Sequence, residues 1–238
     1  MKKYVEIVTP VHNEGASIYS TLDEYYTFFK NTDIDIKFVI SEDGSTDETL
    51  DEIEKFALKT DINLITSKNR KGYSKAVIDG LKETSSDIVC FIDSDGQCDP
   101  KDLLKLLEKF DGNNLVIGNR KPRSDNSFRL FISFIFKILY VYLTKIKLLD
   151  PSCPYFISSK KNIEKILATE NIGILKQGFW WEFYARATYL NIEILEVTVN
   201  HRIRKSGSTV VFKASKLPRI AIDHIFSLFK LSKILKNL

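Results

Sequence analysis

The chain has 238 residues and a net charge of +4, with 44% hydrophobic and 28% charged residues. This length and composition are typical of a globular protein of one large or two small domains, and they exclude a disordered or low-complexity chain. Three cysteines are too few for a disulfide scaffold and lack zinc-finger spacing, so we expect a reducing compartment. No apolar run is long enough for a plain membrane span, and Glu6 stands where a secretion signal would be apolar.

The net charge conceals an asymmetry along the chain. Residues 1–118 carry 14 Lys and Arg against 23 Asp and Glu, whereas residues 119–149 carry 7 against 1 and residues 200–238 carry 9 against 1. Acidic clusters attract metal ions, and basic segments attract phosphates, nucleic acid or anionic membranes. The basic segments are rich in apolar residues and contain no recognised nucleic-acid motif, which disfavours nucleic acid as the partner.

Apolar runs of strand length alternate with helical patterns in the first half of the chain. They predict strands at residues 4–9, 36–41, 62–66, 87–92 and 115–118, and helices at 16–30, 46–59, 73–84 and 100–110. Such regular alternation indicates an α/β fold with a mostly parallel sheet flanked by helices on both faces.

Polar residues follow each predicted strand. They occupy residues 10–14, 42–47, 69–72, 93–97 and 119–120. Ligands of open parallel sheets bind beyond the carboxyl ends of the strands, so this edge is the predicted binding site.

Asp93 and Asp95 follow the fourth predicted strand and are two residues apart. Side chains two apart in a strand point the same way, so the two carboxylates can share a hard divalent cation that takes further ligands from a phosphate and water. The alternative is a solvated loop that caps the next helix. Asp99 before Pro100 suits that capping role, whereas Asp93 and Asp95 come too early for it.

Residues 128–149 predict an aromatic, apolar helix with one narrow polar stripe. The stripe consists of Arg129, Ser133, Lys137, Tyr140, Thr144 and Lys147. Residues 213–237 form a second amphipathic pattern. The aromatic helix could cover the sheet or form a dimer core, or it could lie in a bilayer interface. We favour the membrane surface, because Lys137 argues against a span and basic residues suit an anionic leaflet.

The ordered set of loops resembles glycosyltransferase family 2, the nucleotide-sugar transferases with the GT-A fold. The motifs are Pro10-Val11-His12-Asn13-Glu14, Glu42-Asp43-Gly44-Ser45-Thr46-Asp47, Asn69-Arg70-Lys71-Gly72 and Asp93-Ser94-Asp95-Gly96-Gln97, followed by Gly118-Asn119-Arg120, Asp150–Phe156, Trp180-Trp181-Glu182 and Arg204–Thr209. The order is most similar to the dolichyl-phosphate (polyprenyl-phosphate) mannosyl- and glucosyltransferase branch. The resemblance spans residues 4–212.

The resemblance implies a role for each matching residue. The nucleotide sugar would be bound by Pro10, Asn13, Glu14, Glu42, Asp43, Lys71, Gly72, Asp93, Ser94 and Asp95; Mg²⁺ or Mn²⁺ by Asp93, Asp95 and Gln97; and the acceptor phosphate by Arg120 and Arg129. Arg204 would reach the diphosphate, and Asp95 and Arg204 would carry catalysis. For a hydroxyl acceptor, Glu182 is the candidate base.

The implied reaction is inverting, metal-dependent transfer of a hexose from a UDP- or GDP-sugar to a polyprenyl phosphate. We expect a GT-A domain at 1–212, a basic amphipathic helix at 213–238, and a cytoplasmic protein peripherally attached to the membrane. Two alternatives stay open: transfer to a saccharide or protein hydroxyl, and a catalytically silent module that binds nucleotide at the membrane.

Overall fold

The computed structural model describes residues 3–121, 127–176, 178–204 and 217–238, without the side chains of residues 127–133 and 217–222. Its strands are β1 (Lys3–Val11), β2 (Ile34–Glu42), β3 (Ile62–Ile65), β4 (Ile88–Phe91), β5 (Leu115–Arg120), β6 (Phe156–Ser159) and β7 (Ile194–Val199). Its helices are α1 (Gly15–Phe29), α2 (Thr49–Ala57), α3 (Tyr73–Lys82), α4 (Pro100–Lys109), α5 (Ser127–Thr144), α6 (Lys160–Leu167), α7 (Phe179–Tyr189) and α8 (Leu217–Leu235).

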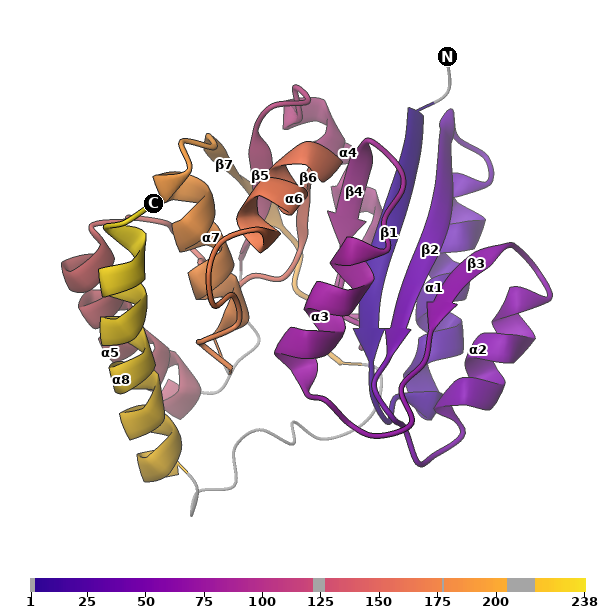
Figure 1. Cartoon of the computed structure of the whole chain (residues 1–238). Helices are drawn as coiled ribbons and strands as arrows, with labels where there is room; N and C mark the ends of the chain where they lie inside the picture. The colour runs from indigo at the N-terminus through magenta and orange to yellow at the C-terminus, as the bar shows by residue number, and fades with distance from the viewer. Residues whose placement is uncertain (1–2, 122–126, 177, 205–216) are drawn as a thin grey trace.

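The strands form one sheet in the order β3-β2-β1-β4-β6-β5-β7 (Figure 1). All neighbours are parallel except β6, which runs antiparallel to both β4 and β5. The predicted mostly parallel sheet flanked by helices is therefore confirmed. The antiparallel β6 between β4 and β5, and β7 at the edge, are elements that the sequence analysis missed.

Two cores cover the two faces of the sheet. Side chains of α1, α2 and α4 pack on one face, and side chains of α3, α6 and α7 pack on the other. Alternate β1 residues divide between them, since Ile7 belongs to the first core and Val8 to the second. This alternation is the period of a strand that is buried on both sides, and it explains the nearly continuous apolar run of β1.

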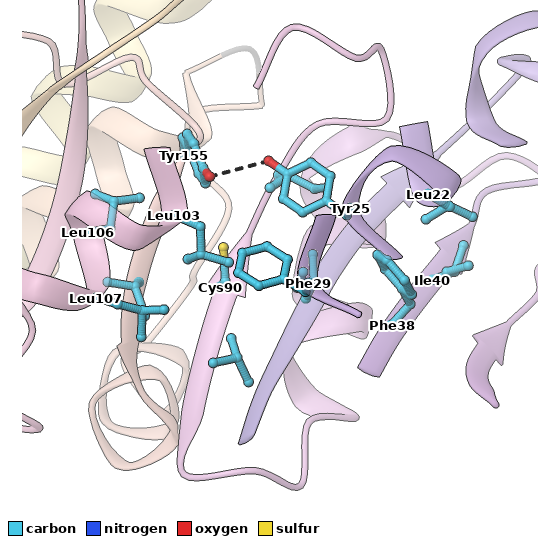
Figure 2. Close-up of a cluster of buried hydrophobic side chains, with 14 of the residues drawn as sticks. Leu22, Tyr25, Phe29, Phe38, Ile40, Cys90, Leu103, Leu106, Leu107 and Tyr155 are labelled. Atoms are coloured by element: carbon cyan, nitrogen blue, oxygen red, sulfur yellow. Dashed lines mark hydrogen bonds between the residues drawn. The ribbon is translucent and has the colours of Figure 1, made fainter. Parts of the chain in front are cut away.

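Two buried tyrosines in the first core support the loop that follows β4 (Figure 2). The hydroxyl of Tyr25 donates to the hydroxyl of Tyr155 at 3.3 Å, and Tyr155 donates to the backbone carbonyl of Asp99 at 3.0 Å. Asp99 in turn caps α4 by accepting from the backbone N–H of Lys101, as the sequence predicts. The end of the loop is thus fixed from inside the core.

A third cluster joins α5, α7 and α8. Figure 1 shows α5 and α8 side by side, with α7 between them and the sheet. The helix predicted over 128–149 ends earlier, at Thr144, because Lys145 adopts a left-handed φ of 62° that cannot continue a helix. The second predicted amphipathic segment contains α8, and the predicted domain boundary at residue 212 lies outside the described residues.

Glu182 in α7 is fully buried within a structural network. Its carboxylate accepts from the backbone N–H groups of Gly173 and Leu175 at 2.9 and 2.8 Å, and from Arg186 at 2.7 and 2.9 Å. Arg186 also donates to backbone carbonyls of Glu170 and Asn171. A carboxylate with both oxygens engaged and no exposed surface is badly placed to take a proton from an acceptor, so this geometry speaks against the expected base role.

We predict that Glu182→Gln lowers the free energy of unfolding by about 3 kcal/mol or more, because it leaves the Arg186 charge buried without its partner. Chemical denaturation measures this effect. Glu193→Gln, at an exposed position, is the control and should stay within about 0.5 kcal/mol of the native protein. A Glu182→Gln protein of native stability would contradict the structural role.

Candidate functional site

Asp43, at the carboxyl end of β2, organises the loop after β3. Its two carboxylate oxygens accept hydrogen bonds from the backbone N–H groups of Lys71 and Gly72, at 2.6 and 2.8 Å. Gly72 has a φ of 97°, which a residue with a side chain rarely adopts. Asp43 is buried, and the Lys71 ammonium pairs with Asp79 of α3. The predicted nucleotide turn is therefore held down through its backbone.

The loops after β1 and β2 are joined through Asn13. Its backbone N–H donates to the Ser45 hydroxyl at 3.0 Å, and its side-chain oxygen accepts from the N–H of Thr46 at 2.8 Å. Glu42 accepts from the N–H of Ser45 in the same turn. These bonds bring the predicted residues of β1 and β2, with buried Pro10 behind them, into one surface.

Arg204 reaches the same surface from the segment after β7. Its guanidinium forms an ion pair with Glu14, whose carboxylate also accepts from the Ser17 hydroxyl at 2.9 Å. Burial raises the pKa of Glu14, while the Ser17 hydrogen bond and the Arg204 charge oppose that rise. The predicted diphosphate arginine and the predicted donor loop are thus neighbours. Residues 205–209, the rest of that motif, lie outside the described residues.

Asp93 and Asp95 lie just beyond β4. Burial and the neighbouring Asp95 charge raise the pKa of Asp93 to about 7, whereas the charges of Arg120 and Arg204 act to lower it. The backbone between them is anchored, because the Ser94 carbonyl accepts from the Thr21 hydroxyl at 3.4 Å. Two close carboxylates are unfavourable unless a cation compensates them.

The donor set of this loop fits a hard divalent cation. Within the described parts of the chain, no three His, Cys, Asp or Glu side chains group as a self-sufficient metal site. Two carboxylates suit Mg²⁺ or Mn²⁺ that completes its shell with phosphate oxygens and water. Gln97 uses its side-chain N–H to donate to the Arg202 carbonyl at 2.9 Å, and its role as a ligand stays a prediction.

Arg202 fastens the strand segment that carries Arg204 to the loop after β4. Its guanidinium pairs with Asp99 at 2.7 Å and with Glu24 of α1, and its backbone N–H donates to the Gln97 carbonyl at 3.1 Å. The sequence analysis missed this residue. The Arg-x-Arg spacing of 202 and 204 was the available signal, since residues two apart in an extended segment face the same side.

Of the two predicted acceptor arginines, the structure describes the side chain of Arg120. Arg120 ends β5, and its Nε and Nη2 donate to the Asp150 carboxylate at 2.7 and 2.9 Å, while Nη2 also donates to the Ser152 hydroxyl at 2.6 Å. The pair joins β5 to the 150–152 turn. Arg129 is in α5, and its side chain lies outside the described residues. Glu182 lies apart from these loops in its own network.

Solved structures share this fold. Glucosyl-3-phosphoglycerate synthase from Mycobacterium tuberculosis, in complex with Mn²⁺, UDP and glucosyl-3-phosphoglycerate, has a TM-score of 0.69 at 20% identity, covering 97% of this chain and 80% of that chain. The same enzyme with Mg²⁺ and UDP gives 0.69 at 19% identity with the same coverage. At this identity the likeness establishes the fold, which is GT-A.

Curated relatives are similar over most of this chain. Undecaprenyl-phosphate 4-deoxy-4-formamido-L-arabinose transferase from Pseudomonas savastanoi pv. phaseolicola is 26% identical over 214 residues, covering 87% of this chain and 60% of the relative. The protein of that name from Pseudomonas paraeruginosa is 25% identical over 234 residues, covering 94% and 66%. The chain therefore spans about three-fifths to two-thirds of the length of these relatives.

We predict that Asp93→Asn stabilises the metal-free protein, and more at pH 8 than at pH 5. The unfolded chain loses the Asp93 proton near its ordinary pKa of 3.8, but the folded protein keeps it until about 7. The free energy of unfolding therefore falls as the pH rises through this window, by about 4 kcal/mol at most above pH 7. Asparagine removes that loss. Thermal unfolding at the two pH values measures the difference.

Asp111→Asn is the control, because its effect on the free energy of unfolding should have the opposite sign. Hydrogen bonds from the N–H groups of Asn113 and Asn114 lower the pKa of Asp111, so its charge stabilises the fold above its ordinary pKa. This variant should lose stability at neutral pH. An Asp93→Asn protein with the same stability gain at pH 5 and pH 8 would mean that folding does not raise the pKa of Asp93.

Residues 6–167 match the family model described as Glycosyl transferase family 2, which covers more than half of the chain. The matched region contains the loops after β1, β2, β3 and β4 that converge on one edge of the sheet. The resemblance found in the loop motifs is thereby confirmed, and the chain belongs to glycosyl transferase family 2.

Proposed function

We propose that this protein transfers a hexose from a nucleotide diphosphate sugar to a polyprenyl phosphate at a membrane surface, with inversion and with Mg²⁺ or Mn²⁺. One observation carries the proposal. The first turn of α7 contacts both the acidic loop after β4, through Tyr73, and the pair of helices α5 and α8, whose outer face is apolar. Trp180 of α7 donates to Tyr73, which contacts Asp93, while the next residue, Trp181, packs on Phe136 of α5.

The donor half of the proposal uses the loops after β1, β2 and β4. When bound by Asp93 and Asp95, the cation neutralises the charge that grows on the diphosphate leaving group. Arg204 adds a second positive charge at the same place, and Glu14 holds its guanidinium before donor binds. Asp43 fixes the backbone turn at Gly72, which lets the nucleotide approach closely.

The acceptor half needs positioning rather than a base. A phosphate monoester is mostly dianionic at neutral pH, with a second pKa of about 6, and it attacks without losing a proton first. Arg120 and Arg129 are the guanidinium groups that would orient it. The buried, ion-paired Glu182 agrees with a reaction that has no general base, and it leaves the hydroxyl-acceptor alternative without its candidate.

The face of α5 that points to solvent supports a membrane surface. Tyr140 and Thr144, from the predicted polar stripe, are buried against α7, where the Tyr140 hydroxyl donates to the Trp181 carbonyl at 3.0 Å. The apolar side is the exposed one. Burying these two stripe residues turns Phe134, Ile135, Ile138 and Tyr142 outward, which is unfavourable in water and favourable at a bilayer.

Helix α8 extends this surface. Leu228 and Leu231 are buried, whereas Phe226 and Phe229 are 71% and 47% exposed. We call the whole surface the apolar platform, and it consists of Phe134, Ile135, Ile138 and Tyr142 of α5 with Ile225, Phe226 and Phe229 of α8. Exposed lysines flank it at 145, 147, 230 and 233. Aromatic rings beside lysines suit an anionic headgroup region.

Helix lengths and relatives support the same proposal. In the described residues, no helix has the length and hydropathy that a membrane crossing requires. The curated relatives carry undecaprenyl phosphate in their names, a polyprenyl phosphate whose tail lies in the bilayer. An enzyme acting on such an acceptor must bring its site to the surface, which an apolar platform on one side of the domain would do.

The catalytic proposal is tested by incubating the protein with UDP- and GDP-hexoses, a short polyprenyl phosphate and Mn²⁺, followed by mass spectrometry. We expect glycosylated polyprenyl phosphate with at least one donor, and no product from Asp95→Asn. Asp87→Asn, exposed at the other end of β4, is the control and should retain activity. Nucleotide binding without transfer or donor hydrolysis would identify the silent module instead.

The membrane proposal is tested by flotation with anionic vesicles. We predict that the native protein floats, that salt weakens the binding, and that part of it persists because the apolar contact is not screened. The double variant Phe134→Ser/Phe226→Ser should bind at least tenfold more weakly, since each ring contributes about 1 kcal/mol or more.

The matched control for flotation is Leu58→Ser. Leu58 is 88% exposed at the end of α2, outside the apolar platform, so its loss should leave flotation unchanged. A native protein that stays in the soluble fraction at low salt would remove the physical support for a lipid acceptor.

A further inference from the structure

A chain of two hydrogen bonds ends on Asp93. The indole N–H of Trp180 donates to the hydroxyl of Tyr73 at 2.9 Å, and that hydroxyl donates to Oδ1 of Asp93 at 2.8 Å. The three residues come from α7, α3 and the end of β4, and 107 positions separate Trp180 from Tyr73. The bonds therefore depend on the whole fold rather than on local sequence.

The direction of both bonds is fixed by chemistry. An indole has one N–H donor and no acceptor, so the Tyr73 oxygen must accept from Trp180. The Tyr73 proton is then directed to Asp93. Trp180 is itself held firmly, since it is 5% exposed and packs on Phe91 and Phe156 with ring centroids 4.4 and 5.4 Å apart.

We propose that Tyr73 is a positioning residue for the donor site, with Trp180 as its support. The hydrogen bond to Oδ1 fixes the rotation of the Asp93 carboxylate and leaves Oδ2 as the oxygen for the divalent cation. This inference rests on the proposed function, because it concerns how the cation and the nucleotide diphosphate are bound. Without the hydroxyl, the carboxylate must be ordered at the moment of binding, which weakens the complex.

The placement of Tyr73 agrees with this role. It is the first residue of α3 and follows Gly72, whose left-handed backbone turns the chain into the helix. Its side chain is 39% exposed, so burial alone does not account for its position. Its hydroxyl nevertheless makes hydrogen bonds to two other elements, the indole of Trp180 and the carboxylate of Asp93. The Asp43 bonds to Lys71 and Gly72 place the preceding turn, and hence the start of α3.

The test compares Tyr73→Phe with the native protein and removes only the hydroxyl. Mn²⁺ binding in the presence of UDP is measured by electron paramagnetic resonance, and transfer is measured with saturating donor. We expect Mn²⁺ affinity and kcat to fall by about tenfold or more each, the loss of one hydrogen bond to a charged group. The KM for the polyprenyl phosphate should not change. Tyr4→Phe, at an exposed position near the amino end of β1, is the control.

Trp180→Phe provides a second variant. It removes the donor to Tyr73 but keeps the Tyr73 hydroxyl, so it should weaken Mn²⁺ binding by less than Tyr73→Phe does. Intrinsic fluorescence adds a readout that needs no turnover: Trp180 is one of two tryptophans, and its emission should respond to Mn²⁺ with UDP in the native protein and less in Tyr73→Phe.

The outcomes separate this inference from the proposed function. A native protein that binds neither Mn²⁺ nor UDP would overturn the proposed function. A native protein that binds both, beside a Tyr73→Phe variant with equal Mn²⁺ affinity and kcat, would overturn the positioning role alone. If Tyr73→Phe fails to fold, Trp180→Phe decides by the same two measurements.

Discussion

The repulsion between two carboxylates at the end of β4 is the constraint on which the site depends. Burial raises the pKa of Asp93, and the neighbouring charge of Asp95 raises it further. The surrounding contacts hold this arrangement against the repulsion. The Ser94 carbonyl is anchored on α1, Gln97 is tied to Arg202, and the guanidinium charges of Arg120 and Arg204 partly compensate the negative charge. Under the proposed function, these contacts hold the loop in place to receive a cation.

A second unfavourable arrangement lies on the other side of α7. Tyr140 and Thr144 of the α5 polar stripe are buried and make hydrogen bonds, whereas Phe134, Ile135, Ile138 and Tyr142 are left to solvent. Neither feature is expected of a domain that is optimised for stability alone, because exposed apolar surface and close like charges both cost free energy. Under the proposed function, binding removes each of these costs. A cation with a diphosphate would compensate the carboxylates after β4, and a bilayer would cover the exposed apolar side of α5.

The elements that the sequence predicts are those that hydrophobic periodicity or a local motif defines. The first five strands and the first four helices follow from apolar period, and Asp93 and Asp95 from their spacing. The antiparallel β6 is only four residues long and depends on pairing with β4 and β5, so no local pattern defines it. The early end of α5 depends on the left-handed backbone of Lys145. A lysine at this position gives no sequence signal for such a conformation, as a glycine would.

The same limit applies within the site. Tyr73 and Arg202 act through partners far away in sequence, which a single sequence does not reveal. Glu182 is a possible base from its place in a motif, although Arg186 four residues later indicates a helical ion pair.

Trp180 and Trp181 connect the site to the apolar helices. Neighbouring helix residues point about 100° apart, so Trp180 contacts Tyr73 of the Asp93 site and Trp181 packs on α5. The first turn of α7 therefore contacts both the Tyr73–Asp93 pair and α5, the helix that carries part of the apolar platform. Under the proposed function, the tail of the acceptor stays in the bilayer, so its phosphate lies at a fixed distance from the membrane surface. A rigid helix turn would keep the donor site at that same distance, which a mobile linker would not do.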